Sequence, residues 1–181
     1  MSLYDSFLQA CKDGEINEVK RLSSSVDPTA DNNYAIRMAS RYGHLEVVKF
    51  LSSLPGVDPT VYDNYAIQWA SRYGHLEVVK FLSSLPRVDP TADDNYAIRL
   101  ASRYGHLEVI KFLLSLPGVD LTANDNFAIR WASRVGHLEV VKFLSSLPGV
   151  DPTVSNNYAI QWASFSGHLE VVKFLSSLPG V

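Results

Sequence analysis

The chain has 181 residues, of which 46% are hydrophobic and 19% are charged, and its formal net charge is -3. This composition is typical of a soluble folded protein and excludes an intrinsically disordered chain. The small negative balance excludes an overall electrostatic attraction to nucleic acid or to an anionic membrane, so any such attraction would need a local patch.

The single cysteine, Cys11, excludes an internal disulfide framework and fits a reducing compartment. No apolar run approaches the ~20 residues that a membrane-spanning helix needs. The first residues, Met1 to Asp5, lack the basic and then apolar order of a secretory signal. A cytoplasmic or nuclear protein without a membrane segment is therefore expected.

Residues 2–22 are predicted to form two helices that turn at Gly14. Apolar residues such as Phe7 and Cys11 recur there at helical spacing. Polar residues are more frequent in this segment than later in the chain, as is typical of a terminal unit with one face in water. Residues 1–32 are therefore interpreted as an N-terminal cap.

A ten-residue phrase, Tyr-Gly-His-Leu-Glu-Val-Val-Lys-Phe-Leu, then recurs with small changes along the rest of the chain. Its glycines lie 31 residues apart, at Gly43, Gly74, Gly105, Gly136 and Gly167. A fixed period of this size indicates stacked supersecondary units. With the cap they form one repeat domain over residues 1–181, in which the later units are residues 33–63, 64–94, 95–125, 126–156 and 157–181.

Each later unit follows one plan, which residues 64–94 illustrate. Asn64 is predicted to cap a first helix over residues 65–73, and Gly74 is predicted to end that helix in the left-handed conformation. A second helix, over roughly residues 76–85, is apolar except for one narrow stripe and needs cover on several sides. The loops show no alternating apolar pattern. The prediction is therefore an all-α fold, an α-solenoid of six stacked helix-turn-helix repeats.

Units with Gly-His-Leu-Glu-Val-Val-Lys-Phe-Leu, followed by an aspartate that opens a turn, resemble ankyrin repeats over essentially the whole chain. Tyr-Ala-Ile-Arg or Tyr-Ala-Ile-Gln replaces the usual Thr-Pro-Leu-His, and the period is 31 residues rather than about 33. The shorter period implies shortened loops with little or no β-hairpin. The Tyr-Ala-Ile-Arg-Trp-Ala-Ser units also resemble divergent ankyrin arrays of amoebae and giant DNA viruses, and a viral origin would imply the host cytoplasm.

Five histidines occupy one position in successive units, at His44, His75, His106, His137 and His168. Neighbouring copies should lie about 8–10 Å apart, whereas zinc needs its ligands within about 2.0–2.3 Å of one ion. Each histidine is therefore expected to bond locally at the start of the second helix, and no metal or other cofactor is predicted. Cys11 is interpreted as a small core residue. No polar group stands apart from the repeat plan as a catalytic one would, so no enzyme activity or catalytic residue is predicted.

One recurring stripe is a candidate binding surface. Arg–Tyr pairs end the first helices, and a further arginine or a glutamine stands one turn earlier on the same helix face. The resemblance to ankyrin repeats implies that this helix lines a concave surface and that the pair before the glycine contacts partners. The predicted protein-binding residues are Arg37, Arg41, Tyr42, Arg72, Tyr73, Arg99, Arg103, Tyr104, Arg130 and Arg134. Arginine and tyrosine are residue types that carry interface hot spots.

Two hypotheses for this stripe stay open. In the first, the arginines bind a partner protein with an acidic or carbonyl-rich surface, which makes the chain a protein–protein interaction scaffold. In the second, they pair with loop aspartates of adjacent units and brace the stack; both can hold together. The stripe ends at Phe165 and Ser166, so it has a direction along the chain.

Three further hypotheses concern the chain as a whole. A structural spacer would stack or self-associate end to end through its C-terminal unit, whose apolar surface is expected to meet a partner or a continuation past Val181. Binding of single-stranded nucleic acid would suit arginine and tyrosine but is disfavoured by the negative net charge. The similarity of the units also leaves an engineered array open.

Overall fold

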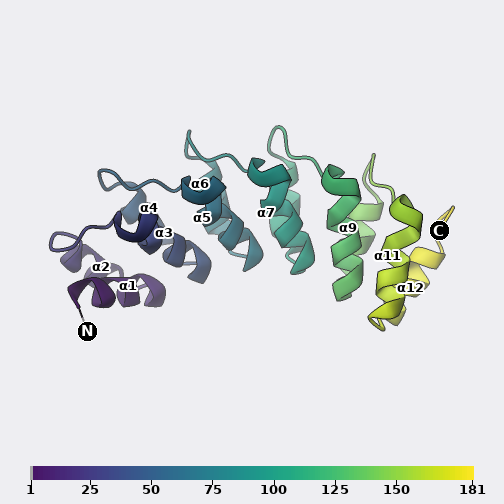
Figure 1. Ribbon diagram of the computed structural model, residues 1–181, viewed down its shortest axis with the longest axis horizontal. Coiled ribbons are helices and arrows are strands. Elements are labelled where there is room, and N and C mark those ends of the chain that lie inside the picture. The colour runs from purple at the N-terminus through teal and green to yellow at the C-terminus, as the bar shows by residue number, and fades with distance from the viewer. Residues whose placement is uncertain (1) are drawn as a thin grey trace. The chain divides into compact units, whose positions relative to one another are not determined.

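A computed structural model describes residues 2–181, apart from the side chain of Ala123. Within that range the chain forms twelve α-helices and no strand, which confirms the all-α prediction (Figure 1). The helices belong to two compact units, of which the first ends at Ala92 and the second begins at Asp93. No helix among the described residues has both the length and the apolar character needed to span a bilayer.

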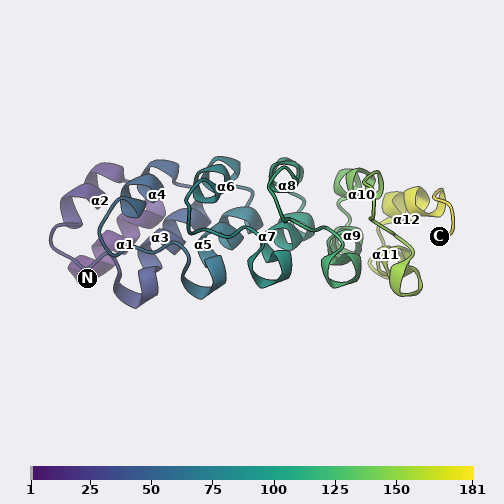
Figure 2. The same ribbon diagram turned by 90° about the horizontal axis from the view of Figure 1, so that it is seen from above.

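The first unit contains three helix pairs that pack against their sequence neighbours. α3 contacts α1 and α5 in one row, and α4 contacts α2 and α6 in a second row (Figure 2). The bounds are α1 Leu3–Asp13, α2 Ile16–Leu22, α3 Ala30–Tyr42, α4 Leu45–Ser52, α5 Val61–Arg72 and α6 Leu76–Ser83.

The second unit repeats this arrangement. α9 packs against α10 and α11, and α12 packs against α10 and α11. The bounds are α7 Ala92–Arg103, α8 Leu107–Leu114, α9 Ala123–Val135, α10 Leu138–Ser145, α11 Val154–Phe165 and α12 Leu169–Ser176. In each unit we call the row of odd-numbered helices the odd-helix row. Helix pairs that contact the next pair along the chain confirm the predicted solenoid of helix-turn-helix repeats.

Small residues of the odd helices and branched residues of the even helices build the core. Ala35 and Ala39 of α3 are fully buried, as are Val48 and Leu51 of α4. Burying a side chain such as that of Leu51 contributes about 1.5–3 kcal/mol. The wide apolar face that the sequence shows on the even helices is therefore covered on several sides, and it holds neighbouring repeats together.

A left-handed turn lies at the start of every odd helix after α1, before the right-handed part of that helix. In the α5 copy, three consecutive residues have positive φ: Tyr62 at 54°, Asp63 at 54° and Asn64 at 66°. The amide of Asn64 donates to the carbonyl oxygen of Thr60 at 2.8 Å and closes the turn. Asparagine and aspartate tolerate this region better than other side chains, and they fill most of these positions. The right-handed part of α5 therefore begins at Tyr65, as predicted.

Asn64 stands at the predicted cap position, but the predicted capping bond is wrong. Its Oδ1 accepts a hydrogen bond of 2.9 Å from the amide of Asp89, in the loop of the next repeat, rather than from an amide of α5. The same bond joins Asn33 to Asp58, Asn95 to Asp120 and Asn126 to Asp151, at 2.8, 2.9 and 3.2 Å. In these four repeats the asparagine thus ties the left-handed turn to the following loop.

Two turn signals of the sequence are confirmed. Gly14 and Gly74 have positive φ values of 76° and 77°, as expected of glycines that end a helix. The even helix α6 ends at Ser83, two residues earlier than predicted. In the loops between pairs, an aspartate such as Asp58 accepts hydrogen bonds of 2.9 and 2.7 Å from the amide and hydroxyl of Thr60. The described loops contain no β-hairpin.

Candidate protein-binding surface

The arginines that end the odd helices lie against aromatic rings. In the first unit, the guanidinium carbon of Arg41 lies 4.9 Å from the ring centroid of Trp69 and 5.2 Å from that of Tyr73, both in the next repeat. It also lies 5.5 Å from the ring of Tyr42. Cation–π contacts contribute about 0.5–1 kcal/mol each at exposed sites and more where water is excluded. Arg41 is therefore held among three rings, and Arg72 lies 5.5 Å from the ring of Tyr73.

The second unit has the same arrangement around tryptophans. The guanidinium carbon of Arg103 lies 4.0 Å from the ring centroid of Trp131 and 5.5 Å from that of Tyr104. The guanidinium carbon of Arg134 lies 4.6 Å from the ring of Trp131 and 4.5 Å from that of Trp162. Trp131 thus contacts two guanidinium groups, one from its own helix and one from the preceding repeat.

No acidic side chain among residues 2–181 lies within ion-pair distance of Arg41, Arg103 or Arg134. The hypothesis that these arginines pair with loop aspartates is therefore wrong. Arg87 does form an ion pair with a loop aspartate, since its Nη2 lies 2.6 Å from Oδ2 of Asp58. Aromatic rings brace the stack instead. We call Arg41, Arg103 and Arg134 the stacked arginines; their guanidinium N–H groups form no hydrogen bond with the described part of the chain.

Arg37, one turn before Arg41, hydrogen-bonds to the left-handed turn at the start of its own helix. It is only 9% exposed, and its Nη2 donates to the carbonyl oxygen of Asp31 at 2.8 Å. Its guanidinium carbon also lies 5.1 Å from the ring of Tyr34 and 4.9 Å from that of Tyr62. Arg37 therefore stabilises this left-handed turn.

The same position acts alike in the other repeats. Arg99 and Arg130 donate to the carbonyl oxygens of Asp93 and Asn124 at 3.0 and 2.7 Å. Where glutamine replaces arginine, its Nε2 donates to the corresponding turn: Gln68 to Asp63 at 2.7 Å, and Gln161 to Asn156 at 2.6 Å. Because both side chains donate to the left-handed turn of their own helix, either arginine or glutamine can occupy this position. A binding role for Arg37, Arg99 and Arg130 stays a prediction.

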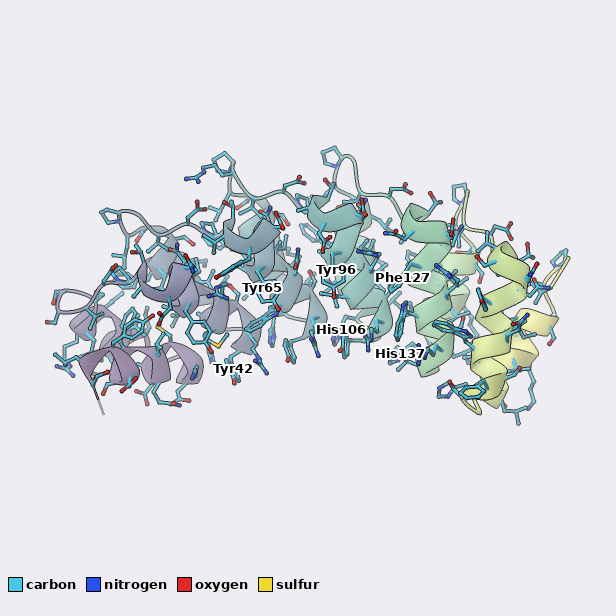
Figure 3. All side chains as sticks on the ribbon, in the orientation of Figure 1. Tyr42, Tyr65, Tyr96, His106, Phe127 and His137 are labelled. Carbon is cyan, nitrogen blue, oxygen red and sulfur yellow. The ribbon has the colours of Figure 1, made fainter. Side chains whose placement is uncertain are left out.

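The tyrosines of the stripe remain accessible. Tyr42, at the end of α3 (Figure 3), and Tyr73 are exposed, Tyr104 is half-buried, and Val135 replaces the tyrosine in the next repeat. The tryptophans that hold the arginines were absent from the predicted site. The sequence carried one signal for them, because Trp69 and Trp131 stand three residues before an arginine, on the same face of a helix.

The histidines connect repeats, so the expected local bond at the start of the even helix is wrong. Nε2 of His44, His75 and His137 lies 2.7, 2.8 and 3.0 Å from the carbonyl oxygens of Lys12, Arg41 and Arg103. Each acceptor lies near the end of the odd helix in the preceding repeat, where a carbonyl has no partner within its helix. Nε2 must carry the hydrogen, because a carbonyl accepts. Among the described residues no three His, Cys, Asp or Glu side chains gather closely enough to hold a metal ion.

The half-buried His75 makes stability depend on pH. Burial lowers the pKa of His75 below 6.5; the bond to the Arg41 carbonyl acts in the opposite direction, and His44 lowers the pKa further. In the unfolded chain this group titrates near pH 6.5. Stability is therefore fully present above about pH 6.5 and is lost as the pH falls towards the lower folded pKa, because the unfolded state binds the proton first. We expect the urea midpoint of unfolding to decrease from pH 7 to pH 5.

The matched variant is His75→Gln, which keeps an N–H donor and does not titrate. Its urea midpoint should decrease less steeply over the same range. A wild-type midpoint that stays constant from pH 7 to pH 5 would contradict the role given to His75.

Cys11 lies in the core of the first helix pair. Its side chain is fully buried, and burial raises the pKa of the thiol to about 12. A thiol with that pKa stays protonated at neutral pH and is a poor nucleophile. The interpretation of Cys11 as a small core residue is confirmed.

A comparison with protein families agrees with this architecture. The model of a family described as ankyrin repeats (three copies) matches residues 7–94, 54–125 and 98–180. No curated protein matches the chain. The likeness to amoebal and viral arrays therefore stays a prediction. Since the matches together span residues 7–180, the chain belongs to the ankyrin repeat family.

Proposed function

We propose that this protein is an interaction scaffold whose odd-helix row, as the concave face, binds a partner protein through the stacked arginines. Ankyrin repeats generally mediate protein–protein interactions and are typically non-enzymatic scaffolds. One observation supports the finer proposal most. Arg41, Arg103 and Arg134 are held by aromatic rings, while their N–H groups have no acceptor among residues 2–181.

The chemistry of a held guanidinium favours a carboxylate ligand. Its planar fork donates two parallel hydrogen bonds to one carboxylate. Because the rings already restrict the side chain, little further rotamer freedom is lost on binding. The exposed Tyr42 and Tyr73 add amphipathic contact area beside Arg41. The proposed partner therefore presents an acidic surface, and we place the encounter in the cytoplasm or nucleus.

A second hypothesis is a spacer that associates end to end through its last repeat. It is favoured by two exposed apolar side chains in the last helix pair, Phe165 at 93% and Leu169 at 61% exposed. Single-stranded nucleic acid fits the residue types of the odd-helix row, but the net charge of -3 opposes it. A partner that binds through carboxylates uses the stacked arginines, whereas end-to-end association through the last repeat leaves Arg41 and Arg103 unused.

A fluorescein-labelled glutamate octapeptide serves as the acidic probe for a test by fluorescence anisotropy. The double variant Arg41→Gln/Arg103→Gln removes one stacked arginine from each unit and should weaken binding about tenfold or more. It should also lower the melting temperature, because the contacts with Trp69 and Trp131 are lost.

The matched control is Lys49→Gln/Lys111→Gln, which removes the same charge from the even helices, where both lysines pair with glutamates. This control should bind the octapeptide nearly as well as the wild type. Equal weakening in the two double variants would show that only overall charge matters and would refute the proposed surface.

A further inference from the structure

The last repeat departs from the others where the odd-helix row ends. Phe165 occupies the position that arginine holds in four earlier repeats, and Ser166 replaces the tyrosine or valine that follows it. Phe165 is 93% exposed, more than any other large hydrophobic residue in the described part of the chain. A large aromatic ring that is left in water is a candidate contact site.

A pocket of about 440 Å³ lies beside this ring. Its lining consists of Arg134, Gln161, Trp162, Phe165 and Ser166. Trp162 and Phe165 stand three residues apart on α11, so they share one helix face and form an apolar wall. Arg134 comes from α9, and its guanidinium carbon lies 4.5 Å from the ring of Trp162. The pocket therefore combines two aromatic rings with one cation.

This combination arises in the last repeat because of one substitution. In the repeat before it, Trp131 has Arg134 three residues further along its own helix, at 4.6 Å from its ring, and Arg103 at 4.0 Å. Trp162 has Arg134 from the preceding repeat but Phe165 on its own helix. Trp131 is contacted by an arginine of its own helix, Arg134, whereas the corresponding residue on the helix of Trp162 is Phe165. An apolar wall therefore replaces one of the two guanidinium groups.

The charges of the lining decide which ligand fits. Arg134 is the one ionised side chain in the lining, and no acidic side chain of the described residues pairs with it. A cationic ligand would be repelled by Arg134. A purely apolar ligand would remove water from the guanidinium without replacing its hydrogen bonds, which is unfavourable. A carboxylate would accept bonds from Arg134, while an adjoining apolar group would cover Phe165 and Trp162.

We propose that this pocket binds a peptide segment of a partner protein in which a bulky apolar side chain adjoins an aspartate or glutamate. The proposal extends the proposed function and rests on it in one respect, since Arg134 belongs to both surfaces. It adds a requirement that the other stacked arginines do not impose, namely an apolar side chain next to the carboxylate. The pocket would then fix the position and direction of an acidic partner along the repeats of the second unit.

The test uses blocked dipeptide amides and the indole N–H resonances of the three tryptophans in ¹H–¹⁵N NMR spectra. Trp162→Phe identifies the resonance of Trp162. Acetyl-Phe-Asp-amide should shift that resonance with an affinity in the millimolar range. Acetyl-Phe-Asn-amide, acetyl-Phe-Lys-amide and acetyl-Gly-Asp-amide should each bind about tenfold more weakly, because each lacks the carboxylate or the apolar group.

Phe165→Arg is the sharpest variant, because it restores the residue that four other repeats carry at this position. It should leave the melting temperature unchanged and abolish the shift of Trp162 by acetyl-Phe-Asp-amide. It should preserve or strengthen binding of the glutamate octapeptide, because it adds a further arginine to the row. Arg134→Gln should remove the preference for Asp over Asn in the dipeptide.

The two proposals fail in different ways. Octapeptide binding without a dipeptide shift would refute the pocket and leave the odd-helix row supported. A dipeptide shift without octapeptide binding would refute the row and leave the pocket supported. Equal shifts with the Asp and Asn dipeptides, or a shift that survives Phe165→Arg, would overturn the pocket. A wild-type dimer in sedimentation that Phe165→Arg converts to a monomer would assign this face to a second copy and overturn it as well.

Discussion

Gly43→Ala should lower the free energy of unfolding by about 2–5 kcal/mol, one of the largest effects of any single methyl group in this chain. Gly43 has a φ of 80°, where a residue with a Cβ atom is strained by about 1–2 kcal/mol. A Cβ atom there would also lie 2.4 Å from Nδ1 of His75. The ring must move, and its bond to the Arg41 carbonyl is then lost. Urea unfolding monitored by circular dichroism measures the difference.

Two controls separate the backbone strain from the clash. Gly167 has almost the same φ, 78°, but a Cβ atom there would have no neighbouring atom within 4 Å, so Gly167→Ala should cost only about 1–2 kcal/mol. In the second unit, a Cβ atom on Gly136 would lie 2.5 Å from Nδ1 of His168. Gly136→Ala should therefore lower the free energy of unfolding about as much as Gly43→Ala. The double variant Gly43→Ala/His75→Ala should lower the free energy of unfolding by less than the sum of the two single variants. Equal costs at Gly43 and Gly167 would rule out the histidine contact as the cause.

Asn64→Ala should lower the free energy of unfolding by about 2–4 kcal/mol, from two independent contributions. Alanine at a φ of 66° is strained, and the amide of Asp89 loses the acceptor that Oδ1 supplies. Asn64→Gly loses the hydrogen bond to Asp89 but adds no backbone strain, because glycine adopts positive φ freely. We expect about 1–3 kcal/mol for this variant, together with faster hydrogen exchange at the Asp89 amide.

Asn157 provides the matched control in the last repeat. It has a φ of 61°, but its buried Oδ1 has no hydrogen-bond partner among the described residues. Asn157→Gly should therefore leave the free energy of unfolding nearly unchanged. If Asn64→Gly and Asn157→Gly had the same effect, the bond between the asparagine and the following loop would contribute nothing to the stacking of repeats.

The position of the candidate surface was predictable, but its chemistry was not. The helical spacing of Arg37 and Arg41 places them on one helix face, and both lie on α3 of the odd-helix row. Their contacts differ, because Arg37 donates to its own turn while Arg41 reaches rings of the next repeat. That difference depends on how far one repeat is displaced against its neighbour, which no residue spacing within a repeat specifies.

The sequence by itself determined the local structure of this protein. Period, helix pairs and the left-handed glycines depend on residues within one or two turns of each other, and so they follow from propensity and pattern. Only the tertiary structure decided the partners of the polar side chains, since Asn64 bonds 25 residues ahead and His75 bonds 34 residues back. A side chain takes whichever donor, acceptor or ring the packed neighbour brings within reach, and that choice is made when the apolar faces of the repeats come together.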